Sequence, residues 1–97
     1  MAITVVWTPE AEETFDEIIR YLEVEFGDAV VRNFLRRVAE VISTVSQFPE
    51  IFQSAGTKNV RKGFIARQTS LYYSVKGDRI ELISFWNNKR NPENLKW

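Results

Sequence analysis

Hydrophobic residues recur at two spacings along the chain, and the change of spacing separates a helical part from a strand part. Between residues 9 and 45 the apolar positions repeat every three to four residues, which is the spacing of one helix face. We predict a first helix over Pro9–Glu25 and a second helix over about Ala29–Val45. Acidic residues lie opposite the apolar face of the first helix, namely Glu12, Glu13, Asp16, Glu17 and Glu23.

Local signals mark the ends of both helices. Thr8 precedes Pro9, which favours a helix start because a hydroxyl caps free N–H groups and proline fits the first turn. We predict that Gly27 ends the first helix and that Asp28 caps the second. So short a connection makes the two helices an antiparallel hairpin. Pro49 is expected to end the helical region.

The remaining segments are rich in β-branched and aromatic residues and read as strands. A short strand, Ile3–Trp7, precedes the first helix, and three strands joined by tight turns are predicted within Asn59–Pro92. Gly77 and Asp78 are expected to form the last turn, because a two-residue hairpin needs positive φ. Residues 50–58 are predicted to be a connection without strand structure. The helical hairpin has a wide apolar face, and the sheet is its expected packing surface.

The last strand is apolar on both faces toward its end, so we predict that it is a central strand of the sheet. Simple alternation gives it two sets of side chains on opposite faces. One set is Ile80, Leu82, Ser84 and Trp86, and the other is Glu81, Ile83 and Phe85.

Length and composition narrow the class of protein. A chain of 97 residues makes one domain, residues 1–97, with a single core. The absence of cysteine and histidine excludes cysteine nucleophiles, the commonest metal ligand and the usual neutral-pH general base. We therefore expect no metal and no cofactor. No leader peptide or membrane-spanning run is recognised, which predicts a cytoplasmic protein with no membrane partner.

Charge is divided unevenly between the two halves, although the net charge is zero. Up to Gln53 there are ten acids against four arginines, which gives −6. From Ser54 onward there are three acids against nine lysines and arginines, which gives +6. The asymmetry favours an anionic partner for the C-terminal half. Mutual attraction between acidic helices and a basic sheet explains it equally well.

Several segments together resemble the RelE/ParE superfamily of bacterial toxins, also called plasmid stabilisation proteins. The resemblance covers nearly the whole chain and rests on a combination of features: Pro49 after the second helix, Arg61, the pair Tyr72-Tyr73, and the F-W-x-N-basic-x-N-P run at Phe85–Pro92. It implies an α+β fold in which a helical hairpin packs on one face of a mainly antiparallel four-stranded sheet, in the order β-α-α-β-β-β. It also implies a cognate antitoxin that masks the working surface.

Members of the superfamily act in two ways: RelE-like toxins cut messenger RNA in the ribosome, and ParE-like toxins poison DNA gyrase. The resemblance implies that RNA cleavage needs arginine and lysine on the sheet and often a tyrosine in the tail. In this chain Ser70 stands where an arginine is expected, the tail has no tyrosine, and Lys89 replaces the usual arginine, with Arg90 beside it. A serine cannot replace bidentate phosphate recognition by a guanidinium. This favours the ParE-like interpretation, and whether the protein is an enzyme stays open.

Cations of the C-terminal half are the candidates for target contact: Arg61, Arg67, Lys89, Arg90, Lys62 and Lys58. Strand periodicity places Arg61 and Arg67 on one face and Lys62 on the other. The alternative for Arg61 is a structural bridge to a helix acid. Leu95 and Trp97 are candidates for antitoxin contact or for docking on the protein's own sheet. The catalytic residues are not predicted.

Three functions remain as hypotheses from the sequence. The first is a ParE-like toxin that binds and inhibits DNA gyrase and is neutralised by a cognate antitoxin. The second is a RelE-like endonuclease that acts on messenger RNA in the ribosome with a diverged basic site. The third is a non-toxic interaction module with the same fold. The sequence also leaves a homodimer possible.

Overall fold

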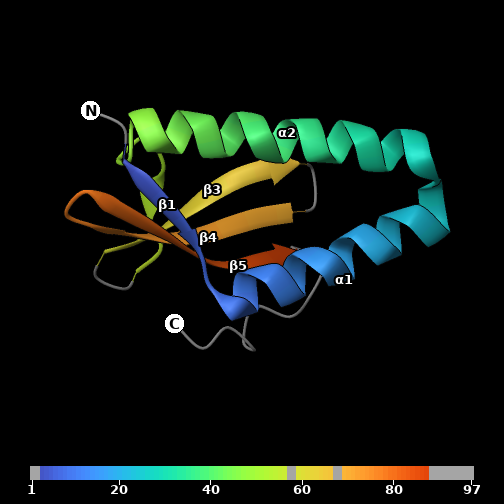
Figure 1. Ribbon diagram of the computed structural model, residues 1–97, viewed down its shortest axis with the longest axis horizontal. Helices are drawn as coiled ribbons and strands as arrows, with labels where there is room; N and C mark the ends of the chain where they lie inside the picture. The colour runs from blue at the N-terminus through green and yellow to red at the C-terminus, as the bar shows by residue number, and fades with distance from the viewer. Residues whose placement is uncertain (1–2, 57–58, 67–68, 88–97) are drawn as a thin grey trace.

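The computed structural model describes residues 3–56, 59–66 and 69–87. Two helices and five strands follow one another in these residues: β1 (Thr4–Trp7), α1 (Pro9–Phe26), α2 (Asp28–Gln47), β2 (Gln53–Ser54), β3 (Val60–Ala66), β4 (Thr69–Lys76) and β5 (Arg79–Asn87). The α+β class, the helical hairpin and the β-α-α-β order are as predicted. Figure 1 shows α1 running outward past the ends of the strands and α2 returning alongside the sheet, with a tight turn between the two helices.

The ends of α1 follow from its capping residues. Thr8 Oγ1 accepts the Ala11 N–H at 3.1 Å, as the sequence predicted, and also donates to the Leu82 carbonyl at 2.7 Å. The same side chain thus starts the helix and ties that start to β5. At the other end Gly27 has φ +89°, a conformation that glycine adopts without steric cost, and its N–H bonds the carbonyls of Leu22 and Glu23.

The start of α2 differs from the prediction. Gly27, not Asp28, is the residue before the first helical turn, and no side-chain hydrogen bond caps this end. Asp28 is already helical, so its carboxylate lies in the first turn, where a negative charge interacts favourably with the positive end of the helix dipole. The two helices share Gly27 as their only linker, which leaves no separate position for a cap.

The sheet has the strand order β1-β5-β4-β3-β2, with β1 parallel to β5 and every other pair antiparallel. The last strand, β5, lies between β1 and β4, as its two apolar faces predicted. Gly77 has φ +61° in the two-residue turn between β4 and β5. The sheet has five strands instead of four because Gln53 and Ser54, in the predicted connection, pair with Lys62 and Arg61.

The two faces of the sheet differ in what covers them. The two helices pack on one face, here called the inner face, where Ile65, Leu71, Tyr73, Ile80 and Leu82 join the core. The opposite face is called the outer face. By register it carries Lys62, Phe64, Ser70, Tyr72, Ser74 and Val6.

A bulge in β5 changes which residues reach the core. Tyr72 is opposite Ser84, but Tyr73 is opposite Leu82, so Ile83 is an extra residue in β5. Leu82 and Phe85 are both in the core, and Ile83 and Ser84 lie between them on the outer side. The predicted alternation of this strand is therefore wrong beyond Leu82, because an inserted residue reverses the face of everything after it.

No described helix is long and apolar enough to cross a membrane.

Candidate functional site

Of the cations predicted to contact a target, Arg61 and Lys62 lie in the described part of the chain, next to each other on β3. Their side chains point to opposite faces, since Arg61 pairs with the core residue Tyr73 and Lys62 pairs with Tyr72. The remaining candidates fall outside the described residues: Arg67, Lys58, Lys89, Arg90, Leu95 and Trp97. They stay predictions.

Arg61 is bound to the backbone of the segment that follows α2. Its guanidinium donates to the Phe52 carbonyl at 2.6 Å and to the Glu50 carbonyl at 3.4 Å. The Tyr73 hydroxyl donates to the neighbouring Pro49 carbonyl at 2.9 Å. The two side chains hold the turn after α2 against the inner face. Arg61 therefore has a structural task whether or not it also contacts a target, and its partners are carbonyls instead of the predicted helix acid.

Burial sets the proton affinity of the two neighbouring phenols. Desolvation raises the pKa of Tyr73 above its ordinary value, and the positive charge of Arg61 acts in the opposite direction with less effect. Desolvation also raises the pKa of Tyr72 on the outer face. Both phenols are therefore neutral hydrogen-bonding groups at physiological pH, and neither is poised to act as a base.

The other described cations of the C-terminal half are partly neutralised within the sheet. Lys76 and Arg79 both contact the Glu81 carboxylate, at 3.1 and 3.2 Å. Lys62 is exposed on the outer face and, among the described residues, has no ion pair or hydrogen bond through its side chain. Of the four described cations after Ser54, Lys62 is therefore the one that presents its charge freely to a partner.

An apolar groove opens where the helical hairpin extends past the end of the sheet. Its volume is about 430 Å³, and its walls come from both helices and from the ends of β3, β4 and β5. The lining is largely hydrophobic: Glu17, Ile18, Tyr21, Leu22, Phe26, Val30, Asn33, Phe34, Arg37, Ala66, Thr69 and Asn87. Large apolar side chains at its rim are exposed, Phe26 most of all at 58%.

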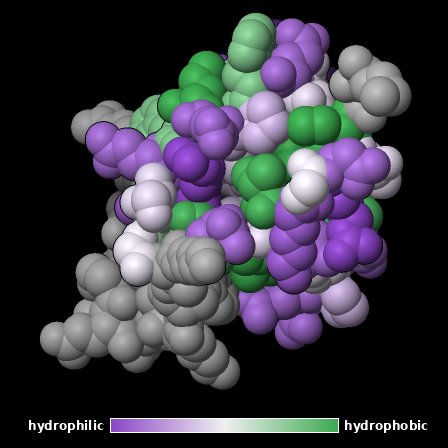
Figure 2. Space-filling model, turned by 90° about the vertical axis from the view of Figure 1, so that its left-hand side faces the viewer, coloured by the Kyte–Doolittle hydropathy of each residue, from purple (hydrophilic) through white to green (hydrophobic). Residues whose placement is uncertain are grey.

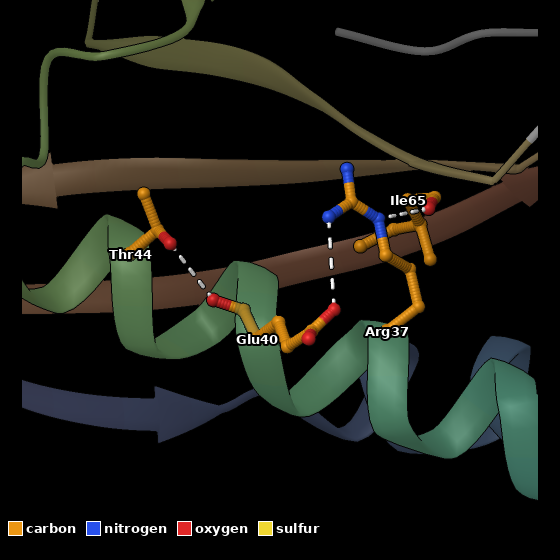
Figure 3. A network of polar contacts seen from close by, with 4 residues as sticks. All are labelled: Arg37, Glu40, Thr44 and Ile65. Atoms are coloured by element: carbon orange, nitrogen blue, oxygen red, sulfur yellow. Dashed lines mark hydrogen bonds and ion pairs between the residues drawn. The ribbon is translucent and has the colours of Figure 1, made fainter.

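Arg37 closes one side of this groove by joining α2 to the free edge of β3. Its Nε donates to the Ile65 carbonyl at 2.7 Å, and its Nη1 lies 3.8 Å from the Glu40 carboxylate (Figure 3). The guanidinium thus satisfies a carbonyl that no further strand pairs with in the described sheet. The contact ties α2 to β3 along this side of the groove.

The sequence analysis missed the groove because it assigned the whole apolar face of the hairpin to packing on the sheet. Only part of that face reaches the sheet, and the part nearest Gly27 lies beyond it (Figure 1). No local signal marked this limit, because Phe26 continues the apolar stripe of α1 in the sequence and is exposed only because the sheet ends before it.

A second, shallower hollow lies at the opposite end of the molecule, beside the β4–β5 turn. Gln47, Phe48, Pro49, Glu50, Ile51, Val75 and Gly77 line it, and Phe48 and Ile51 are exposed. Figure 2 views the molecule from this end and shows hydrophobic residues reaching the surface between hydrophilic ones. The described surface therefore offers two apolar areas, of which the groove between the helices is the more enclosed.

The groove has the lining of a binding surface. Across residues 3–56, 59–66 and 69–87, no group of three or more acidic side chains is placed to hold a metal ion. The groove supplies apolar walls with a few polar side chains at the rim, which suits an amphipathic segment of another chain. Lys62 supplies a charge on a different face.

Comparison with known proteins agrees with this architecture. Residues 5–92 match the family described as ParE toxin of type II toxin-antitoxin system, parDE. No curated protein sequence matches the chain at a significant level.

Solved structures share the fold at low sequence identity. A structure of the chromosomal ParDE toxin–antitoxin system from P. aeruginosa superimposes with a TM-score of 0.73 and 19% identity, covering 88% of this chain and 95% of the other. A YoeB dimer from Staphylococcus aureus gives 0.60 and 12%, covering 84% and 92%. A copper-bound mutant toxin from Helicobacter pylori gives 0.58 and 20%, covering 90% and 96%.

At these identities the structural similarity is a similarity of fold, whereas the family match extends over most of the sequence. The match agrees with the helical hairpin, the sheet order and the resemblance read from the sequence. The chain belongs to the ParE toxin family of type II toxin–antitoxin systems.

Proposed function

We propose that this ParE-family protein acts by binding and inhibiting DNA gyrase, without chemistry of its own, and that a cognate antitoxin neutralises it. The observation that carries the choice of mechanism is Ser70. RNA cleavage in the superfamily is expected to use an arginine at this position, and Ser70 is 1% exposed on β4. Neither the residue nor its exposure suits recognition of a phosphate.

Arg61 supports the same choice. Its guanidinium bonds two backbone carbonyls, so it would have to leave them before it could hold a scissile phosphate. Lys62 is the one observation in favour of the second candidate, an endonuclease for messenger RNA, because it is exposed on the outer face beside Tyr72. A single lysine provides charge but no bidentate positioning. Both candidate targets, gyrase and the translating ribosome, place the protein in the cytoplasm.

A paired assay tests the mechanism. Purified protein is added to DNA gyrase in a supercoiling reaction and, separately, to a coupled translation reaction whose messenger RNA is mapped for new 5′ ends. Inhibited supercoiling with intact message supports the proposal. Cuts in translated message with unaffected gyrase select the endonuclease, and no effect in either reaction selects the non-toxic interaction module.

For the antitoxin, we propose the groove between α1 and α2 as its docking site. The groove is apolar, open at the surface and lined by two helices, so it fits the apolar face of an amphipathic segment. A second copy of this chain is the competing occupant, because the sequence left a homodimer possible. Family membership favours the antitoxin, since the family is defined by a toxin–antitoxin pair.

Two valines of the hairpin provide a matched test. Val30 lines the groove, whereas Val24 is exposed on α1 and does not line it. Val30→Asp leaves a carboxylate against the apolar segment and is expected to weaken antitoxin binding by about 1–3 kcal/mol, roughly 5- to 150-fold. Val24→Asp adds the same charge outside the groove and is expected to leave binding within about threefold.

Isothermal titration with the antitoxin encoded beside the gene measures both variants, and sedimentation measures self-association. Equal affinity of the two variants would remove the groove from the antitoxin interface. Concentration-dependent dimers that Val30→Asp abolishes, with antitoxin binding unchanged, would assign the groove to a second copy.

A further inference from the structure

The negative charge of the helical hairpin is concentrated on α1. Seven acids against one arginine give α1 a charge of −6, whereas three arginines against two acids give α2 a charge of +1. Apart from Glu17, the acidic side chains of α1 form no ion pair or hydrogen bond with a described residue. On the sheet, Lys76 and Arg79 pair with Glu81 instead. Attraction between the described parts of the helices and the sheet therefore does not account for this charge.

One row of side chains carries part of the charge along the apolar groove. Residues four apart lie in a row on a helix surface. On α1 this gives a row here called the acidic ridge: Glu13, Glu17, Tyr21 and Glu25. Glu17 and Tyr21 line the groove, and the exposed residues Glu13 and Glu25 continue the row on either side of them. At about 1.5 Å per residue the ridge is about 18 Å long, which is enough to follow several turns of a docked helix.

The wall of the groove that α2 provides has the opposite sign of charge. Among the described residues that line the groove, α2 contributes two large apolar side chains, one amide and one cation: Val30, Phe34, Asn33 and Arg37. The Arg37 side chain is 46% exposed, although its guanidinium is held at the Ile65 carbonyl. A segment that fills the groove would therefore meet carboxylates along one border of its apolar face and a guanidinium along the other.

We propose that the segment that docks in this groove is an amphipathic helix with lysine or arginine along the border that lies over α1. The inference rests on the proposed docking of the antitoxin in the groove and adds the chemistry of the docked segment. Like charges four residues apart on a helix repel each other, so a cationic partner relieves the repulsion along the acidic ridge. Opposite charges across the rim of an interface also favour one orientation of the partner.

A second copy of this chain fits the groove poorly. Its own described helices bury most of their apolar faces against its own core, as Phe34, Val38, Val41 and Val45 of α2 do. Its α1 is acidic and would be repelled by the acidic ridge. The charge pattern therefore favours a different chain as the occupant.

Two double variants test the charge pattern, with the antitoxin encoded beside the gene as the probe. Glu13→Lys with Glu25→Lys reverses both ends of the acidic ridge. Glu12→Lys with Glu23→Lys is the matched control, because it changes the net charge equally at exposed positions of the same helix. At about 100° per residue, Glu12 is turned away from Glu13, and Glu23 lies on the face opposite Glu25. Urea midpoints check that both variants are folded.

Isothermal titration at about 50 and about 500 mM salt measures the affinity of each variant. At low salt the ridge variant should bind the antitoxin about tenfold more weakly than the unmodified protein, and the control within about twofold. At high salt the difference should shrink, because exposed charges are screened. Equal weakening by both variants would mean attraction to net charge alone and would overturn the proposal. Unchanged or tighter binding by the ridge variant would mean a neutral or acidic border, which overturns it too.

Val30→Asp separates this inference from the docking site on which it rests. If Val30→Asp weakens antitoxin binding and the ridge variant does not, the groove remains the docking site and only the cationic border is wrong. If neither substitution weakens binding, the docking site itself is wrong.

Discussion

The most informative substitution is at Arg61, because the structural and the target-contact interpretations of this residue predict different results. Arg61→Ala removes a guanidinium that donates to the Phe52 carbonyl at 2.6 Å and, more weakly at 3.4 Å, to the Glu50 carbonyl. A hydrogen bond that involves a charged group contributes about 1.5–3 kcal/mol, and the half-buried site leaves the carbonyls partly hydrated. We expect a loss of about 2 kcal/mol in the free energy of unfolding.

Urea unfolding followed by fluorescence measures this loss, with Lys62→Ala as the matched control. Lys62 is the adjacent cation on the same strand, exposed on the opposite face, and its loss should change stability by less than about 0.5 kcal/mol. For a domain of this size, 2 kcal/mol corresponds to roughly 10 °C in Tm.

Arg61→Lys separates the two interpretations. Both bonds come from the terminal Nη1 of Arg61, and a lysine Nζ ends one bond closer to the backbone. Lysine therefore keeps the charge but falls short of the carbonyls, so the structural interpretation predicts most of the alanine loss. A role limited to long-range attraction of an anionic target predicts full stability and near-normal inhibition for this variant. If Arg61→Ala and Lys62→Ala unfold at the same urea concentration, the structural assignment of Arg61 is wrong.

Three further predictions concern other parts of the fold. Thr8→Ala loses the helix cap and the bond to Leu82, so the free energy of unfolding should fall by about 1–2 kcal/mol. Thr8→Ser keeps the hydroxyl and should retain most of that stability in the same urea assay. Gly63→Ala places a Cβ 3.2 Å from the Phe52 ring, and we expect the free energy of unfolding to fall by about 1–2 kcal/mol. The loss should be smaller in a Phe52→Leu background, and additive effects of the two substitutions would contradict the clash. Burial raises the pKa of Tyr73, so the unfolded chain loses its proton first and stability should fall as the pH rises above about 10, towards the folded-state pKa. Tyr73→Phe should flatten that decline in urea midpoints between pH 8 and 11, and an unchanged slope would exclude Tyr73 as its source.

Local pattern along the chain determined the elements and most of their ends. Helical spacing, the Thr8 cap, Gly27 and Gly77 act within a few residues of themselves, so they can be read without knowledge of the rest of the fold. Strand composition likewise predicted a central last strand, which lies between β1 and β4.

Tertiary structure alone decided the features on which the proposed function rests. The extra residue Ile83 in β5, the carbonyl partners of Arg61 and the overhang that opens the groove all depend on how distant segments meet. A pattern of apolar residues shows that a face is buried somewhere but not how far its partner extends. The reason is physical: register and contact are set by packing across the whole core, whereas propensity acts on neighbours in the chain.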